Sequence, residues 1–286
     1  MDADQWTRIS ALLERGEALL DGLAQRYPPP PDVDWSAPAF RWMTAGYLES
    51  IASPNTLPLD RLRGIDRQKD ILLRNTRAFV HGLPANNVLL WGARGTGKSS
   101  LIRALLHEFA GEGLRLIEVD GRDLLALPDI ATKVGERPES FVVFADDLSF
   151  DADDAGFRAL KATLDGSVRS APPNLLVYAT SNRRHLLPEF LDENRQAQNV
   201  NGEIHHGDAV EEKLSLSERF GLWLSFSPFD QEGYLNIVRS HLSALGAAAD
   251  DPEAQRAALQ WALARGVRSG RSAEQFARDW CARQAL

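Results

Sequence analysis

Residues 92–99 read Gly-Ala-Arg-Gly-Thr-Gly-Lys-Ser, which is the spacing of a glycine-rich loop that ends in a lysine and a hydroxyl side chain. An apolar run at 88–91 comes directly before this loop, and a helical pattern at 100–106 follows it. Glycines let the backbone turn back and aim successive N–H groups at one point, and the helix N-terminus adds a positive dipole. A strand, a loop and a helix in this order predict a phosphate-binding site.

The predicted phosphate site makes a defined set of contacts. In loops of this kind the lysine reaches the β- and γ-phosphates and the hydroxyl coordinates Mg²⁺. We therefore expect nucleotide binding by Gly92, Ala93, Arg94, Gly95, Thr96, Gly97, Lys98, Ser99 and Ser100, with Ser99 also a metal ligand.

Five apolar runs predict the central sheet. They lie at 88–91, 114–119, 141–145, 175–179 and 222–226, and helix-length segments separate most of them. Continuous apolar runs are typical of parallel strands that helices cover on both faces. We expect a three-layer α/β fold with a parallel five-stranded sheet.

The rest of the chain divides into segments that differ in composition and periodicity. Residues 1–26 have apolar residues at helical spacing, and the prolines of 28–31 end that pattern. Residues 190–216 are polar and without a period, which predicts a loop or insertion. The predicted domains are 1–58, an N-terminal helical extension with a proline-rich linker; 59–228, the core; and 229–286, an all-α lid.

Two carboxylates follow the third predicted strand. Asp146 and Asp147 come directly after the run at 141–145, and ligands in open α/β sheets bind at the carboxyl ends of strands. Asp146 is then suited to hold Mg²⁺, and Asp147 to orient or deprotonate the attacking water. The alternative is that the two aspartates only begin a turn.

Three further polar residues are candidates for the same site. Asn182 follows the fourth strand and is expected to contact the attacking water and the γ-phosphate. Arg219 precedes the last strand, where it could stabilise charge on the γ-phosphate of a neighbouring subunit. Arg271 precedes a capping box at 272–275 and is expected to touch the γ-phosphate, with Arg268 as its rival. The structural alternatives are a turn-capping asparagine, an intramolecular ion pair and a solvated loop arginine.

Taken together, these residues resemble an AAA+ ATPase from Leu59 to the C-terminus. The resemblance implies ATP and Mg²⁺ as ligands, hydrolysis of ATP to ADP and phosphate, and an adenine pocket lined by Gly64 and Ile65. Three phrases, 86–100, 146–150 and 214–222, more narrowly resemble a bacterial AAA+ family catalogued only as a domain of unknown function.

One pair departs from the usual AAA+ pattern, because Asp146-Asp147 stands where most members carry Asp-Glu. Aspartate is one methylene shorter, and a misplacement of about 1 Å can cost a hundredfold in rate. We expect an oligomeric ATP hydrolase that remodels or regulates an unidentified partner protein. The alternative is a slow nucleotide-gated switch or loader-type adaptor that could contact single-stranded nucleic acid; a small-molecule kinase is a third, less favoured hypothesis.

The composition bears on which classes of partner the protein binds and where it is located. The net charge of −8 and the lack of a basic stripe with interleaved aromatics do not favour nucleic acid. No apolar run reaches the roughly 18 residues of a membrane helix, and we expect no membrane association. The N-terminus lacks a signal-peptide pattern and Cys281 is the one cysteine, so we expect a cytoplasmic protein.

Overall fold

The computed structural model describes residues 30–148, 172–182 and 219–285, together with positions within 6–19, 160–164 and 198–205. The chain forms two compact units, Met1–Asp34 and Trp35–Leu286. In the first unit, the described positions between 6 and 19 are helical and their leucines are exposed. Among the described residues, no helix combines the length and apolar character that crossing a bilayer requires.

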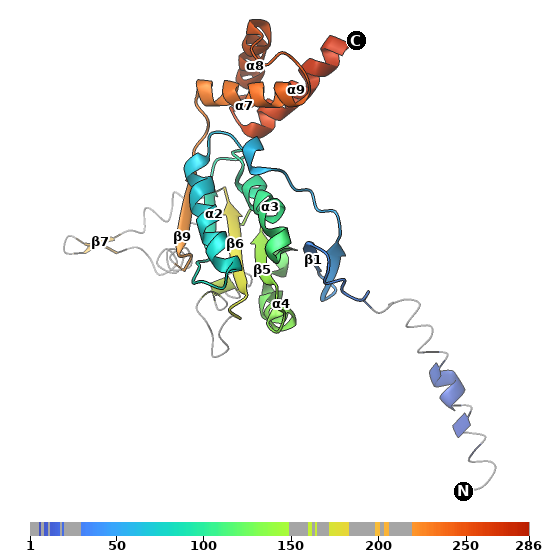
Figure 1. Cartoon of the computed structure of the whole chain (residues 1–286). Coiled ribbons are helices and arrows are strands. Elements are labelled where there is room, and N and C mark those ends of the chain that lie inside the picture. The colour runs from blue at the N-terminus through green and yellow to red at the C-terminus, as the bar shows by residue number, and fades with distance from the viewer. Residues whose placement is uncertain are drawn as a thin grey trace. The chain divides into compact units, whose positions relative to one another are not determined.

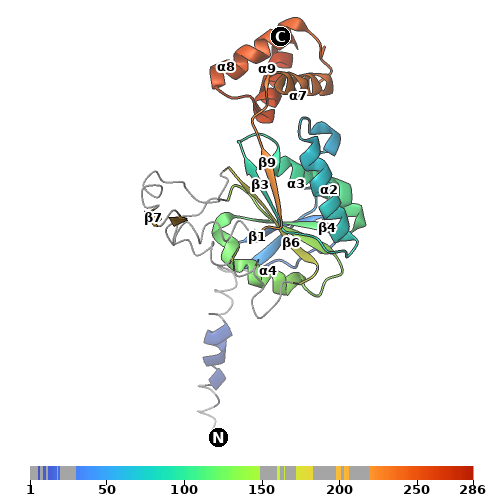
Figure 2. The ribbon, with the colours of Figure 1, turned by 90° about the vertical axis from the view of Figure 1, so that its left-hand side faces the viewer.

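A seven-stranded sheet forms the centre of the second unit (Figures 1 and 2). Its strands in spatial order are β2 (Tyr47–Ile51), β1 (Ala39–Met43), β4 (Leu114–Val119), β5 (Ser140–Ala145), β6 (Leu175–Ser181), β3 (Val88–Gly92) and β9 (Leu222–Phe226). Neighbouring strands are parallel except β1 and β2, which form an antiparallel hairpin. All five predicted strands are therefore present.

The expected strand number is wrong, because the sheet has seven strands rather than five. The two additional strands come from 39–51, a range expected to belong to the helical extension of 1–58. Ala39, Phe40 and Trp42 are buried, Arg41 is exposed, and Phe40 lies beside Ile117 of β4. Periodicity alone does not distinguish an apolar strand of five residues from a short helical segment. The pairing of β1 with β4 is what makes this segment a strand.

Aromatic packing ties this hairpin to the rest of the sheet. The Trp35 ring lies 5.4 Å from Phe40 and 6.2 Å from Phe141, centroid to centroid. The Arg137 guanidinium lies over the Trp35 ring at 4.6 Å. Burial of such rings stabilises cores strongly, so residues from 35 onward belong to the core unit.

Helices cover both faces of the sheet, as expected for three layers (Figure 2). On one face lie α2 (Asp66–Val80) and α3 (Lys98–Phe109), whose Leu72 and Leu101 are buried in one cluster with Leu90 and Phe144. On the other lies α4 (Leu127–Val134), preceded by η3 (Gly121–Ala126). Short 3₁₀ turns occur at η1 (Leu59–Arg61) and η2 (Ala110–Glu112).

Three helices make up most of the C-terminal segment, where an all-α lid is predicted. The helices are α7 (Gln231–Ala244), α8 (Pro252–Arg265) and α9 (Gly270–Ala285), and they share a core of their own. Alanines of α8 at 254, 258 and 262 are buried and let the helices approach closely. Cys281 is partly buried against this core.

Part of the predicted loop 190–216 has regular structure. β7 (Gln198–Val200) pairs with β8 (Glu203–His205) in a two-stranded antiparallel sheet. The rest of that segment lies outside the described residues.

Candidate functional site

The glycine-rich loop connects β3 to α3, and its glycines are required by geometry. Gly92, Gly95 and Gly97 have φ values of 128°, 72° and 100°, in the left-handed region that L side chains rarely adopt. A Cβ on Gly92 would lie 2.1 Å from the Phe226 carbonyl oxygen. The loop therefore turns back at the start of α3, whose first N–H groups have no partner within the helix and suit an anion.

Lys98 lies beneath this loop and is only 6% exposed. Its ammonium donates hydrogen bonds of 2.8 Å to the carbonyls of Gly92 and Ala93, and one of 3.2 Å to the Asn182 side-chain oxygen. Burial lowers the pKa of Lys98, against the charges of Asp147 and Asp146, which raise it. A partly desolvated cation so close to the loop is suited to bind phosphate oxygens.

Two hydroxyl groups contact the first aspartate of the pair. Ser99 Oγ donates to Asp146 Oδ1 at 2.6 Å, and Thr180 Oγ1 donates to the same oxygen at 2.5 Å. Thr180 Oγ1 also accepts from the Asp147 backbone N–H at 2.8 Å. Sequence reasoning missed Thr180; its signal was a buried polar residue at the end of an apolar strand, two positions before Asn182.

The second aspartate is held by side chains from two elements. The Asn182 amide donates to the Asp147 carboxylate, and Arg94 Nη2 lies 3.9 Å from its other oxygen. Asp147 has a φ of 52°, in the left-handed region that is uncommon for non-glycine residues. Such backbone strain is concentrated at functional sites.

Strand register explains why these residues meet. Ala145 of β5 lies beside Ala179 of β6, and Ser181 lies beside Trp91 of β3. Because the three strands are parallel neighbours, Asp146, Asn182 and the glycine-rich loop all emerge at one edge of the sheet.

The oxygens of Ser99 and Asp146 fit a magnesium ion. Mg²⁺ in nucleotide sites is usually held by one or two protein oxygens together with phosphates and waters. Within the described ranges, no group of three or more His, Cys, Asp or Glu forms a metal cluster. The site thus suits an ion that arrives with phosphate rather than one held by protein alone.

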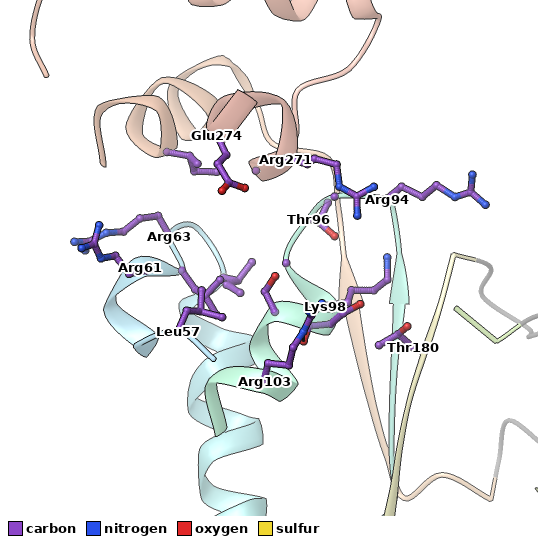
Figure 3. A pocket seen from close by; sticks show the side chains of 18 of the residues that line it. Leu57, Arg61, Arg63, Arg94, Thr96, Lys98, Arg103, Thr180, Arg271 and Glu274 are labelled. Carbon is purple, nitrogen blue, oxygen red and sulfur yellow. Dashed lines mark hydrogen bonds between the residues drawn. The ribbon is translucent and has the colours of Figure 1, made fainter. Parts of the chain in front are cut away.

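A pocket of about 580 Å³ surrounds these groups, a volume typical of small-molecule sites (Figure 3). Its walls come from the loop, the two aspartates, residues 57–65 and the helices α7 and α9. Of the two residues expected to line an adenine pocket, Ile65 lines this pocket and Gly64 does not. A Cβ on Gly64, whose φ is 74°, would lie 3.0 Å from the Phe229 ring, so this glycine instead leaves room for Phe229, which lines the pocket.

The lid contributes Arg271, which lies near Thr96 of the loop (Figure 3). Arg268, its rival, is not among the lining residues. The predicted cap at Ser272 is wrong, because α9 begins at Gly270 and the Ser269 hydroxyl accepts from the Ser272 N–H at 3.1 Å. The Gly270 N–H donates to the Gly95 carbonyl at 2.8 Å, which attaches the lid to the loop.

Arg219 does not join this pocket. It precedes β9, whose other end, at Phe226, lies beside Gly92. Arg219 is therefore at the opposite end of the sheet from the loop, next to an edge strand.

Solved structures share this fold. A proline-to-glycine mutant of RuvB from Thermotoga maritima superposes with a TM-score of 0.52 at 18% identity, over 77% of this chain and 64% of that one. The Orc1 protein of Aeropyrum pernix in complex with DNA gives 0.52 at 15% identity, over 78% and 59%. The chain thus spans less than two thirds of either structure. At these identities the likeness bears on the fold alone, and it confirms the AAA+ P-loop fold expected from the sequence.

Sequence comparison identifies a family. None of the curated proteins matches the sequence. A family model described as "Protein of unknown function (DUF815)" matches residues 35–284, a range that begins at Trp35 and includes the hairpin, the core and the lid. The chain therefore belongs to the DUF815 family.

Proposed function

We propose that the protein binds ATP with Mg²⁺ and hydrolyses it to ADP and phosphate. One observation carries the proposal: Lys98, Ser99, Asp146, Asp147 and Asn182 meet at one edge of the sheet, linked by hydrogen bonds that span up to 84 positions of sequence. A buried lysine under a glycine loop, opposite two carboxylates and an amide, is the set of groups that phosphoryl transfer to water requires.

Each residue has a role in this proposal. Lys98 and the loop N–H groups bind the phosphates, and Arg271 contacts the γ-phosphate from the lid. Ser99 and Asp146 hold Mg²⁺, which neutralises charge on the phosphates when bound. Asp147 and Asn182 orient the attacking water, since both present polar atoms beside Lys98.

We further propose that Arg219 acts on the site of a neighbouring subunit. Its place at the far end of an edge strand keeps it from its own pocket, and an arginine supplied in trans is worth 10³–10⁵ in rate in known cases. The protein would then be active as an oligomer and would use hydrolysis to remodel or regulate a partner protein in the cytoplasm.

The test is ATP turnover per subunit, measured against protein concentration with Mg²⁺. Specific activity that rises with concentration supports a shared site. Arg219→Ala should then lose at least about a hundredfold in turnover while retaining ATP binding, and Arg122→Ala, on the exposed η3 turn, should retain both. Equal turnover in the two variants refutes the intersubunit role.

A second function is favoured by the short carboxylate of Asp147. Asn182 and Arg94 already contact this side chain, and a shift of about 1 Å can cost a hundredfold in rate. A slow nucleotide-gated switch or loader would bind ATP, but its turnover per subunit would stay near zero at every protein concentration. Binding of single-stranded DNA or RNA that weakens as salt is added would support contact with nucleic acid, which the net charge of −8 disfavours.

A further inference from the structure

The pocket has two chemically different ends. The loop, Lys98 and the aspartates form a polar end suited to phosphates. Apolar side chains line the rest of the pocket, which we call its apolar end: Leu57, Leu62, Ile65, Phe229 and Ile237, of which Leu62 and Ile65 adjoin Gly97 of the loop. Figure 3 shows Leu57, Arg61 and Glu274 on one side, away from Lys98 and Thr180. If phosphates occupy the loop, as proposed above, the apolar end receives the base.

His241 lies at this end and has no assigned role. It lines the pocket from α7, one turn after Ile237, so both side chains share one face of the helix. The imidazole is half-buried, and among the described residues it has no hydrogen bond or ion pair. Its ring nitrogens are therefore available to a ligand in the pocket.

The groups that face His241 leave it neutral near pH 7. Burial lowers the pKa of His241, and the guanidinium groups of Arg61 on η1 and Arg278 on α9 lower it further. Glu274 on α9 raises it, but this carboxylate is itself paired with Arg278 at 2.6 Å.

A neutral imidazole and an imidazolium recognise different purines. The neutral ring has one donor and one acceptor, whereas the protonated ring has two donors and no acceptor. Adenine presents an amino donor beside its N7 acceptor, and guanine presents the O6 acceptor in place of that amino group. The lining arginines offer donors only, whereas His241 and the second carboxylate oxygen of Glu274 can each accept from an adenine amino group. Of these two acceptors, the imidazole is the one that becomes a donor within the pH range in which histidine titrates.

We propose that His241 contacts the nucleobase and sets the purine preference of the site, with the neutral ring able to accept from the adenine amino group and the protonated ring favouring guanine. This inference rests on the proposed nucleotide site. The ATP-to-GTP preference therefore falls as the pH is lowered.

The experiment measures dissociation constants of ATPγS and GTPγS with Mg²⁺ from about pH 8 down to the lowest pH at which circular dichroism shows a folded protein, because the lowered pKa of His241 moves its titration to the acidic side of the histidine range. For the full-length protein, the ATPγS preference should fall by about tenfold on acidification, the worth of one hydrogen bond. His241→Phe keeps a ring without polar atoms and should show little preference at either pH. His241→Gln keeps a donor and an acceptor without a charge and should show a preference that does not change with pH.

His107→Gln is the matched control, because His107 is exposed on α3 and does not line the pocket. It should behave as the unmodified protein, and circular dichroism should show all variants folded. A preference in the unmodified protein that does not change with pH overturns the inference, as does a pH dependence that survives in His241→Phe. In both cases ATPγS binding persists and the proposed function stands. Absence of binding to either nucleotide at every pH refutes the proposed function and the inference with it.

Discussion

Thr180 gives the sharpest test of the carboxylate geometry. Its hydroxyl is the only side-chain group in the described site that contacts both aspartates, since it donates to Asp146 and accepts from the Asp147 N–H. Thr180 is 1% exposed, so valine, which has nearly the same shape, fills its space while removing the hydroxyl. Thr180→Val therefore separates hydrogen bonding from packing.

The magnitude follows from the two contacts. An orphaned backbone N–H costs about 1–3 kcal/mol, and a lost hydrogen bond to a carboxylate costs about as much again. Asp146 is exposed and keeps the Ser99 donor, so water replaces part of the second loss. We expect the free energy of unfolding to fall by about 2–3 kcal/mol and turnover to fall by about a hundredfold, because both carboxylates lose their alignment.

The assay pairs urea unfolding with steady-state ATP turnover, titrated with Mg²⁺. Thr180→Ser is the control, since it keeps the hydroxyl and removes one methyl group, with a cost of about 1 kcal/mol in stability and little in turnover. The valine variant should also need more Mg²⁺ for half-maximal turnover. Turnover within threefold of the serine variant, at the same Mg²⁺ requirement, would refute the positioning role.

Three further predictions test the loop, the core and the lid. Gly92→Ala should destabilise the fold by at least about 3 kcal/mol in urea unfolding, because the new Cβ meets the Phe226 carbonyl at a left-handed φ; Gly111→Ala, with open space around it, should change stability by less than about 1 kcal/mol. Tyr178→Phe should lower the free energy of unfolding by about 1–3 kcal/mol, since the fully buried hydroxyl accepts from Asn75 and bonds Thr76. Burial raises the pKa of Tyr178 to about 12, so the ultraviolet absorbance of this residue should not change on titration to about pH 11 while the protein remains folded. The lowered pKa of His241 means that the unfolded state binds more protons just below pH 6.5; stability from this group is complete above that pH and is lost as the pH falls through the lowered value. His241→Gln should therefore reduce the acid-induced shift of the urea midpoint, and an unchanged shift would contradict this assignment.

The elements that the sequence predicts well are those with local causes. The loop at 92–99 requires its glycines because of backbone angles that each residue must adopt for itself, and the five apolar strands are continuous runs of sequence. The hairpin of 39–51 was assigned incorrectly, since its five-residue strands become a sheet edge only by pairing with β4. The cap of α9 was misplaced by three residues for a similar reason, because the contact of Gly270 with the loop sets where the helix begins.

The loop, the core strands and the residue types that phosphate chemistry needs can be predicted from the sequence, because each depends on neighbours within a few positions. Which of these residues meet depends on the folding of the whole chain. It joined Thr180 to both aspartates, excluded Arg219 and Arg268 from the pocket, and brought His241 from the lid to its apolar end. Such contacts depend on strand register and on the docking of the lid helices, which no local pattern in the chain specifies.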